Sequence, residues 1–193
     1  MTAVTVQAST AEQAVATWLD AFNAALAARD ADAAADLFAT TSFWRDLVAL
    51  TWNLKTVEGR EGVHDLLAHT LDSARPRDFR TSEAPAEAGG VIESWLDFET
   101  EVGRGRGHLR LKDGLAWTLL TTLYELKGHE ERRGRSRSMG AEHGIHPDRR
   151  TWLDNRRDEV AELGRSRQPE VLIIGGGQGG IALAARLRQL DVP

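Results

Sequence analysis

The sequence predicts an α+β domain, in which helices pack on a curved antiparallel sheet, followed by a linker and one strand–turn–helix unit of the α/β kind. Three observations predict this arrangement. Apolar residues recur at helical spacing within the first 71 residues. Two glycine-containing hairpin turns follow between residues 91 and 126, and a short apolar run leads into a glycine cluster after residue 174. Helices that precede a run of strands favour separate layers of helix and sheet.

Composition is typical of a soluble protein. Of the 193 residues, 41% are hydrophobic, which is enough for a core, and the formal net charge is −5. The absence of cysteine excludes disulfides and thiolate chemistry, and it fits a reducing compartment. No apolar run is long enough to span a membrane, and residues 1–10 lack the pattern of a signal peptide. We therefore expect a cytoplasmic protein without a membrane partner.

Three helices are expected at the start of the chain. Ser9 and Glu12 have the spacing of a capping box for the first, and Asp30 can cap a second over residues 31–38. A third is expected over residues 60–71. The apolar residues expected to be buried are Val15, Trp18, Leu19, Phe22 and Leu26 in the first helix, Leu37 and Phe38 in the second, and Val63, Leu66, Leu67 and Leu71 in the third.

Two hairpins are expected to build the sheet. A two-residue turn at Gly103-Arg104 lays an acidic strand against a basic strand, which is favourable cross-strand pairing. The predicted pairs are Glu101 with Arg106, Glu99 with His108, Asp97 with Arg110, Phe98 with Leu109 and Leu96 with Leu111. A second turn at Asp113-Gly114 sets Leu111 beside Ala116, Leu109 beside Thr118 and Arg110 opposite Trp117.

The charged face of this sheet is expected to carry Trp95, Trp117 and Leu119 as well. Large aromatic residues among mixed charges suit an isologous contact between two copies. We therefore expect a homodimer through this face, although the same side chains could simply cover the sheet.

The segment over residues 43–57 contains the candidate pocket residues Trp44, Asp46 and Trp52. Their even spacing puts them on one side of a strand, where a carboxylate between two indoles could act as a general acid or base. The alternative is that both indoles belong to the core and that Asp46 caps a turn or pairs with Arg45. No two histidines and a carboxylate share the spacing of metal ligands, so no metal is predicted.

A change in charge near residue 127 marks a domain boundary. Residues 1–126 are strongly acidic, whereas residues 127–170 are slightly basic, and the stretch 127–168 is rich in Arg, Gly and Ser. Arg132, Arg133, Arg135 and Arg137 form a short basic run with acidic residues beside it and no aromatic neighbours, which favours a solvated linker over a nucleic-acid contact. One helix is expected within this linker, over about residues 150–163. The expected domains are residues 1–126, the linker 127–168, and a nucleotide-binding unit 169–193.

The last segment carries the motif with a specific chemistry. An apolar run, VLII, suits a parallel strand buried on both faces, and a helix is expected over residues 181–190. Between them, Gly175, Gly177 and Gly180 satisfy the dinucleotide-binding pattern G-x-G-x-x-G. Such glycines allow the tight turn, the approach of a pyrophosphate and the close packing of helix on strand. The predicted cofactor-binding residues are Gly175, Gly176, Gly177, Gln178, Gly179 and Gly180.

Two resemblances extend these predictions. The stretches 18–38 and 43–63, with the meander that follows, resemble the cone-shaped nuclear-transport-factor-2-like fold, in particular its SnoaL-like group. The stretch VLIIGGGQGGIALAARLRQLDVP resembles the first FAD-binding Rossmann unit of flavin-containing monooxygenases and related FAD/NAD(P)-dependent oxidoreductases. The acidic residue that holds the ribose would lie beyond Pro193, so spacing alone does not separate FAD from NAD(P).

The resemblances together imply the front part of a bacterial FAD-dependent oxidoreductase. The leading hypothesis is that this enzyme is a monooxygenase. FAD would be reduced by NAD(P)H and would transfer oxygen to a small-molecule substrate, while this segment alone would be inactive. One alternative is a free-standing SnoaL-like isomerase or dehydratase with Asp46 as its acid–base group. Another is a non-enzymatic module that dimerises or binds a small ligand.

Overall fold

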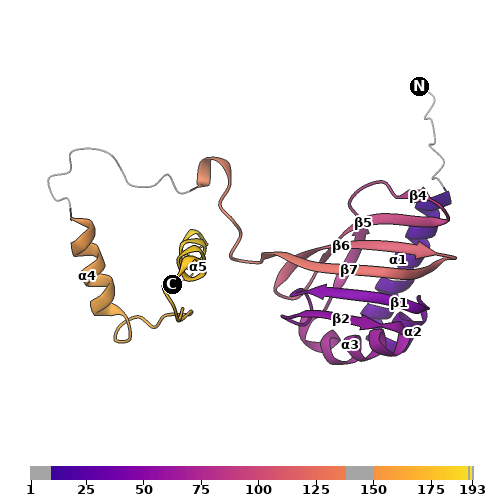
Figure 1. The fold of residues 1–193 in the computed structure, drawn as a ribbon, viewed down its shortest axis with the longest axis horizontal. Helices are drawn as coiled ribbons and strands as arrows, with labels where there is room; N and C mark the ends of the chain where they lie inside the picture. The colour runs from indigo at the N-terminus through magenta and orange to yellow at the C-terminus, as the bar shows by residue number, and fades with distance from the viewer. Residues whose placement is uncertain (1–9, 138–149, 191, 193) are drawn as a thin grey trace, which may run out of the picture. The chain divides into compact units, whose positions relative to one another are not determined.

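The computed structural model describes residues 10–137, 150–190 and 192 (Figure 1). The chain forms two compact units, Met1–Lys127 and Gly128–Pro193. Within the described residues, the first unit contains three helices and a seven-stranded sheet. Its helices are α1 (Thr10–Ala28), α2 (Ala31–Asp36) and α3 (Gly59–Ala74). Its strands are β1 (Phe38–Leu47), β2 (Leu54–Glu58), β3 (Arg77–Thr81), β4 (Ala86–Ala88), β5 (Val91–Glu99), β6 (Gly103–Lys112) and β7 (Leu115–Leu126).

The sheet confirms the predicted α+β class but is not wholly antiparallel. Its strands follow the order β2-β1-β7-β6-β5-β3, with β4 paired to β5. Strands β1 and β7 are parallel, whereas the other neighbours are antiparallel. Parallel neighbours need a long connection, and here the whole of the chain from β2 to β6 lies between them. The first strand therefore enters the sheet beside the last.

The three helices form where the apolar spacing predicts them. Asp30 caps α2, because its side chain accepts a hydrogen bond from the Ala33 amide at 2.9 Å. The second helix is shorter than expected: it ends at Asp36, and Phe38 begins β1. A fully buried aromatic residue is accommodated there by a strand rather than a helix. Ser9, the predicted partner of Glu12 in a capping box, lies outside the described residues.

Aromatic side chains fill the space between the helices and the sheet. Helix α1 packs beside β3 and β5, and α3 packs beside β1 and β2 (Figure 1). Phe22 of α1 is fully buried, and the rings of Phe38 and Trp44 stack on β1 with their centroids 5.7 Å apart. The rings of Phe79 on β3 and Phe98 on β5 also stack, with their centroids 4.6 Å apart. Such close ring contacts leave the centre of the first unit occupied by its own side chains.

The register of the first hairpin differs from the prediction by four residues. Asp97 lies opposite Arg106 rather than Arg110, and the turn is closed by the Thr100 amide, which donates to Gly103 O at 2.9 Å. The physical reason is close packing beneath β6: a β-carbon on Gly105 would lie 2.1 Å from the Phe98 ring. This register places Gly105, a residue without a side chain, under that ring. Because four is an even number, every side chain keeps its predicted face.

The second turn forms at Asp113-Gly114 as predicted, but a β-bulge shifts the pairing beyond it. Leu111 pairs with Ala116 as expected, and then Arg110 pairs with Thr118 instead of Trp117. The extra residue in β7 is Trp117, which the bulge leaves unpaired. Past the bulge the alternation reverses, so Leu119 is buried in the core and does not lie on the charged face.

The second unit contains α4 (Trp152–Glu162), a short 3-10 turn η1 (Gly134–Ser136) and α5 (Gln178–Gln189) within its described residues. Thr151 and Asp154 form a capping box at the start of α4, inside the range predicted for a linker helix. The predicted strand over residues 171–174 is not formed: the described residues offer it no neighbouring strand. A parallel strand takes its hydrogen bonds from such neighbours, so its sequence pattern alone does not produce one.

The glycine beneath Phe98 gives a test of this packing. We expect Gly105→Ala to lower the free energy of unfolding by about 1–3 kcal/mol, the usual cost of an overpacked core. The cost should fall in a Phe98→Leu background, because the atoms that collide with the new methyl group are then absent. Urea unfolding of the four proteins of this double-mutant cycle measures both values. Equal costs in the two backgrounds would contradict the contact.

Candidate functional site

The glycine motif forms a turn that leads directly into α5. Gly175 has a backbone φ of +117°, a region that side chains rarely adopt, so the turn requires glycine there. Gly177 caps the helix, and its carbonyl accepts the first helical hydrogen bond from Ile181 N at 3.0 Å. The helix therefore begins at Gln178, three residues before the predicted start. Its first turn contains no acidic side chain.

The glycines of this motif fall into two classes, according to what an added β-carbon would touch. A β-carbon on Gly180 would lie 2.1 Å from Gly175 O and 3.3 Å from Ile173 Cγ2, so α5 packs directly on the turn at this residue. By contrast, β-carbons on Gly176, Gly177 and Gly179 would meet no atom within 4 Å. One glycine is thus required for packing, while the others leave the helix N-terminus open to a ligand. The first amides of a helix have no partner within it and attract anions.

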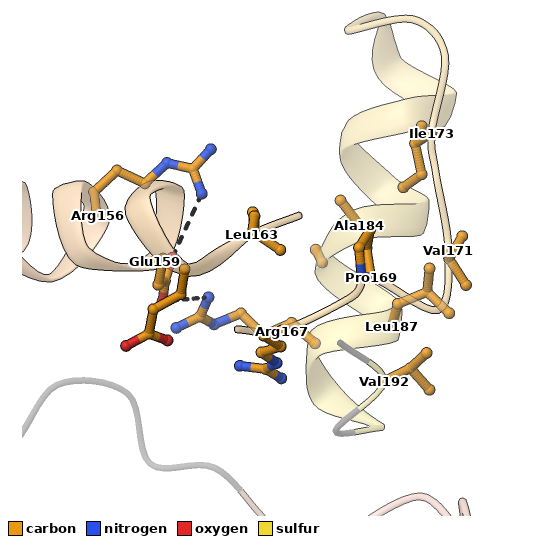
Figure 2. A pocket seen from close by; sticks show the side chains of 13 residues that line it. Arg156, Glu159, Leu163, Arg167, Pro169, Val171, Ile173, Ala184, Leu187 and Val192 are labelled. Carbon is orange, nitrogen blue, oxygen red and sulfur yellow. Dashed lines mark hydrogen bonds and ion pairs between the residues drawn. The ribbon is translucent and has the colours of Figure 1, made fainter. Parts of the chain in front are cut away.

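An apolar segment runs alongside α5. Figure 2 shows Val171 and Ile173 beside Ala184 and Leu187 of that helix. A pocket of 680 Å³ is lined by this segment, by the end of α4 and by α5. The alternate residues point away: Leu172 is 80% exposed and Ile174 is 93% exposed. Residues 171–174 therefore have one face on the helix and one uncovered apolar face.

Ion-paired side chains form part of the lining of this pocket. Arg156 and Glu159 of α4 approach within 3.4 Å (Figure 2). Arg188 of α5 lies 3.6 Å from Glu159. At the other side of α5, Arg186 donates a hydrogen bond to Glu131 at 2.9 Å, which lowers the pKa of that carboxyl. The second unit thus combines an apolar strip with a mixed-charge rim.

The three candidate pocket residues of the first unit are not brought together. Trp44 and Asp46 point into the core from β1, but Trp52 is 62% exposed beyond the strand. The chain reverses between them, because the Val48 amide donates to Asn53 O at 3.0 Å and closes a turn. Trp52 and Val48 both adopt positive φ in this turn. The predicted single strand over residues 43–57 is therefore two strands, and no carboxylate lies between two indoles.

Asp46 is a buried cap for that turn. Its carboxylate accepts hydrogen bonds from the Thr51 amide at 2.9 Å and the Thr51 hydroxyl at 2.8 Å, and the Leu50 amide adds a third at 3.1 Å. The Thr121 hydroxyl of β7 donates to its other oxygen at 2.8 Å and accepts from the Trp44 indole at 2.9 Å. All these donors come from the protein itself. Asp46 has the cap geometry that the sequence left as the alternative to an acid–base group.

The outer face of the sheet, opposite the helices, carries exposed aromatic side chains. Phe43 on β1, Trp117 and Tyr124 on β7, and Trp95 on β5 are between 37% and 48% exposed. Leu119 was predicted to join them, but the bulge at Trp117 turns it inward. Tyr124 lies beneath Arg106, whose guanidinium carbon is 5.3 Å from the ring centroid. This set of residues, with the charged residues between them, is called the outer face below.

Acidic residues of β5 pair with basic residues around them on the outer face. Arg110 donates to Glu93 at 2.8 Å, and Lys127 lies 2.8 Å from Glu99. A hydrogen bond from Lys127 lowers the pKa of Glu99 below its ordinary value. The acidic cluster predicted around Asp97, Glu99 and Glu101 is therefore part of a charged sheet surface.

Within the described residues, no three His, Cys, Asp or Glu side chains are grouped so that they could hold a metal ion. The helices in the same part of the chain include none that is long and apolar enough to cross a membrane.

Comparisons with known proteins find similarity in solved structures only. No protein family matches the chain, and no curated protein matches it. An NTF-2-like protein of unknown function from Burkholderia xenovorans LB400 is 15% identical with a TM-score of 0.44, over 61% of this chain and 88% of that one. A protein of unknown function with a cystatin-like fold from Nostoc punctiforme PCC 73102 is 13% identical with a TM-score of 0.46, over 62% and 96%.

An NTF2-like protein of unknown function from Mesorhizobium loti is 17% identical with a TM-score of 0.44, over 63% of this chain and 99% of that one. Identities and TM-scores at this level concern the course of the chain alone. They carry no information about activity, ligand or assembly.

The environment of Asp46 predicts a structural cost for its replacement. We expect Asp46→Asn to destabilise the first unit by about 1–3 kcal/mol, because the amide nitrogen that replaces one carboxylate oxygen cannot accept from the buried donors that face it. Trp52→Ala, in the same turn but exposed, should change stability by no more than about 0.5 kcal/mol. Urea unfolding compares the two variants. An Asp46→Asn protein as stable as the parent would show that these hydrogen bonds are dispensable.

Proposed function

We propose that residues 169–193 act as the phosphate-binding strand–turn–helix unit of an FAD-dependent oxidoreductase that uses NAD(P)H. The observation that carries this proposal is that the glycines of the motif have two different structural roles. Gly180 lets α5 touch the turn at Gly175, while Gly176, Gly177 and Gly179 leave the helix N-terminus uncovered. A dinucleotide site needs both properties at this spacing.

The residues present fit the pyrophosphate of FAD. The amides at the start of α5 would donate to its oxygens, and the positive end of the helix dipole would stabilise their charge. No acidic side chain opposes an anion in the first turn of the helix. Bound FAD would supply the redox chemistry. If the enzyme is a monooxygenase, this chemistry includes oxygen transfer to a small-molecule substrate. The protein's part at this site is to bind and orient the cofactor.

The apolar segment before the turn supports the same proposal. Val171 and Ile173 lie against α5 while Leu172 and Ile174 are exposed, so both faces of the segment are apolar. Strands of parallel sheets have this character because layers cover them on both sides. In the proposed oxidoreductase, residues 171–174 form such a strand beside further strands of the nucleotide-binding sheet.

A second function is supported for the first unit: self-association through the outer face. Four aromatic side chains are exposed there, and such residues are enriched at the centres of interfaces. Acidic β5 lies beside basic β6, so two copies related by a twofold axis can set the acids of one over the bases of the other. We propose a homodimer built on this face. The isomerase or dehydratase hypothesis stays a prediction that requires the turn over Asp46 to open.

The glycine proposal is tested with inorganic pyrophosphate and the whole chain. We expect saturable shifts of the backbone amide signals of residues 177–180 in NMR spectra. Gly180→Ala should weaken binding about tenfold, because a clash worth ~1.4 kcal/mol moves the helix away from the turn. Gly179→Ala is the matched control: it adds the same methyl group to the same helical turn but meets no atom within 4 Å.

Either of two results would contradict the phosphate site: no shift at residues 177–180, or equal weakening by both alanines. The oxidoreductase part has its own measurement. The protein purified from its natural source should carry flavin absorbance that bleaches when NADPH is added.

The dimer proposal predicts that Trp117→Glu produces a monomer, because it places a charge at the centre of an aromatic contact. Trp152→Glu serves as control, since Trp152 is also exposed but lies on α4 of the second unit. Light scattering over a range of protein concentrations measures the mass of each. The proposal fails if the parent chain is monomeric at high concentration or if both variants dissociate equally.

A further inference from the structure

His108 occupies the middle of the outer face, between two apolar neighbours. In the sheet register it lies opposite Trp95 on one side and Leu120 on the other. Its ring centroid is 4.5 Å from that of Trp95, and its side chain is only 16% exposed although β6 turns it outward. A titratable ring is therefore already largely covered in a single copy of the chain.

Burial favours the neutral form of His108, and the nearby carboxylate that opposes this effect is shared. Glu93 of β5 is 3.7 Å from the ring, but the same carboxylate accepts a hydrogen bond from Arg110 at 2.8 Å. On its own strand His108 lies between Arg106 and Arg110, and across β7 the register brings Arg45 of β1 into the same row.

The remaining nearby groups are either paired with Arg106 or uncharged. Asp97 of β5 lies 3.7 Å from Arg106, and Leu120, the residue of β7 opposite His108, is uncharged. Tyr124, the titratable side chain next along β7, lies under Arg106. Burial lowers the pKa of His108, Glu93 opposes this effect, and Arg110 adds to it.

We propose that His108 is a proton sensor for self-association: two copies pair through the outer face while its ring is neutral and separate when the ring gains a proton. This inference rests on the proposed dimer. A second copy would cover the remaining exposed part of the ring, and the carboxylate beside a charged imidazolium, Glu93, is already shared with Arg110. Placing such a charge in a covered interface is unfavourable.

Linkage fixes the direction of the effect. Protons bind more strongly to the separated copy, so the dimer is fully formed above the pKa that His108 has in that copy, which burial already holds below the ordinary histidine value, and it weakens as the pH falls below that pKa. Each histidine contributes up to about tenfold in the dissociation constant per pH unit in that range, and a dimer contains two such rings. We therefore expect the dissociation constant to rise by about tenfold between pH 7.5 and pH 5.5.

Sedimentation equilibrium of the whole chain at pH 7.5 and pH 5.5 tests the sensor. The parent should dissociate at pH 5.5, whereas His108→Gln, which keeps a neutral polar side chain, should remain dimeric at both. His64→Gln is the control, because His64 is an exposed histidine on α3 with its own acidic neighbours, Asp32 and Asp65. It should behave like the parent.

Each other outcome has a definite meaning. A parent dimer with the same dissociation constant at both values overturns the sensor and leaves the dimer standing. A parent that is monomeric at both overturns the dimer and the sensor together. Dissociation of His108→Gln in parallel with the parent assigns the effect to other groups and overturns the sensor.

A second measurement uses the parent chain alone and does not depend on the variant folding. The pKa of the His108 ring, followed by NMR in a pH titration, should be lower in concentrated than in dilute protein. An equal value at the two concentrations would show that the partner does not cover the ring and would overturn the proposal.

Discussion

The buried carboxylate of Asp46 is the interaction on which the first unit depends. It binds the turn that joins β1 to β2, and through the Thr121 hydroxyl it binds β7. The Trp44 indole completes the same link. Because β1 and β7 are the parallel pair of the sheet, this cluster joins the two ends of the chain's path through the unit. The outer face crosses this parallel pair on its way from β1 to β5, and Arg45 lies beside the cluster in the row that ends at Trp95.

Local patterns predicted the elements whose own residues supply the stabilising contacts. The helices follow from apolar spacing, and Asp30 caps α2 with its own carboxylate. The Asp113-Gly114 turn forms because positive φ at both residues is a local property. The four-residue error in the first hairpin has a different origin, since that register depends on packing between strands, where Gly105 lies under the Phe98 ring of β5. The direction of each side chain was still correct, because alternation survives any even shift.

The features that could not be predicted from the sequence depend on packing between residues that are distant in the chain. Short strands β3 and β4 are edge elements whose pairing is provided by β5, and their sequences lack a strong alternating pattern. Trp52 has the same parity as Trp44, but the turn held by Asp46 removes it from the strand. In the second unit the sequence predicted α5 and the glycine turn, which are local, and failed for residues 171–174, whose strand character needs neighbours. The candidate cofactor site was therefore accessible from sequence, whereas the environments of Asp46 and His108 required the folded sheet.

The two units use the same device, a missing β-carbon, for different ends. At Gly105 the space is filled by an aromatic ring of the core, so the glycine contributes to stability and fixes a register. At Gly180 it is filled by the backbone of Gly175, so the glycine brings a helix onto a turn and leaves the neighbouring positions open. What the absent side chain would touch therefore separates a structural glycine from one that shapes a binding site. By this criterion Gly180 is needed for packing, whereas Gly179 leaves space for a ligand. The spacing G-x-G-x-x-G alone does not distinguish these two roles.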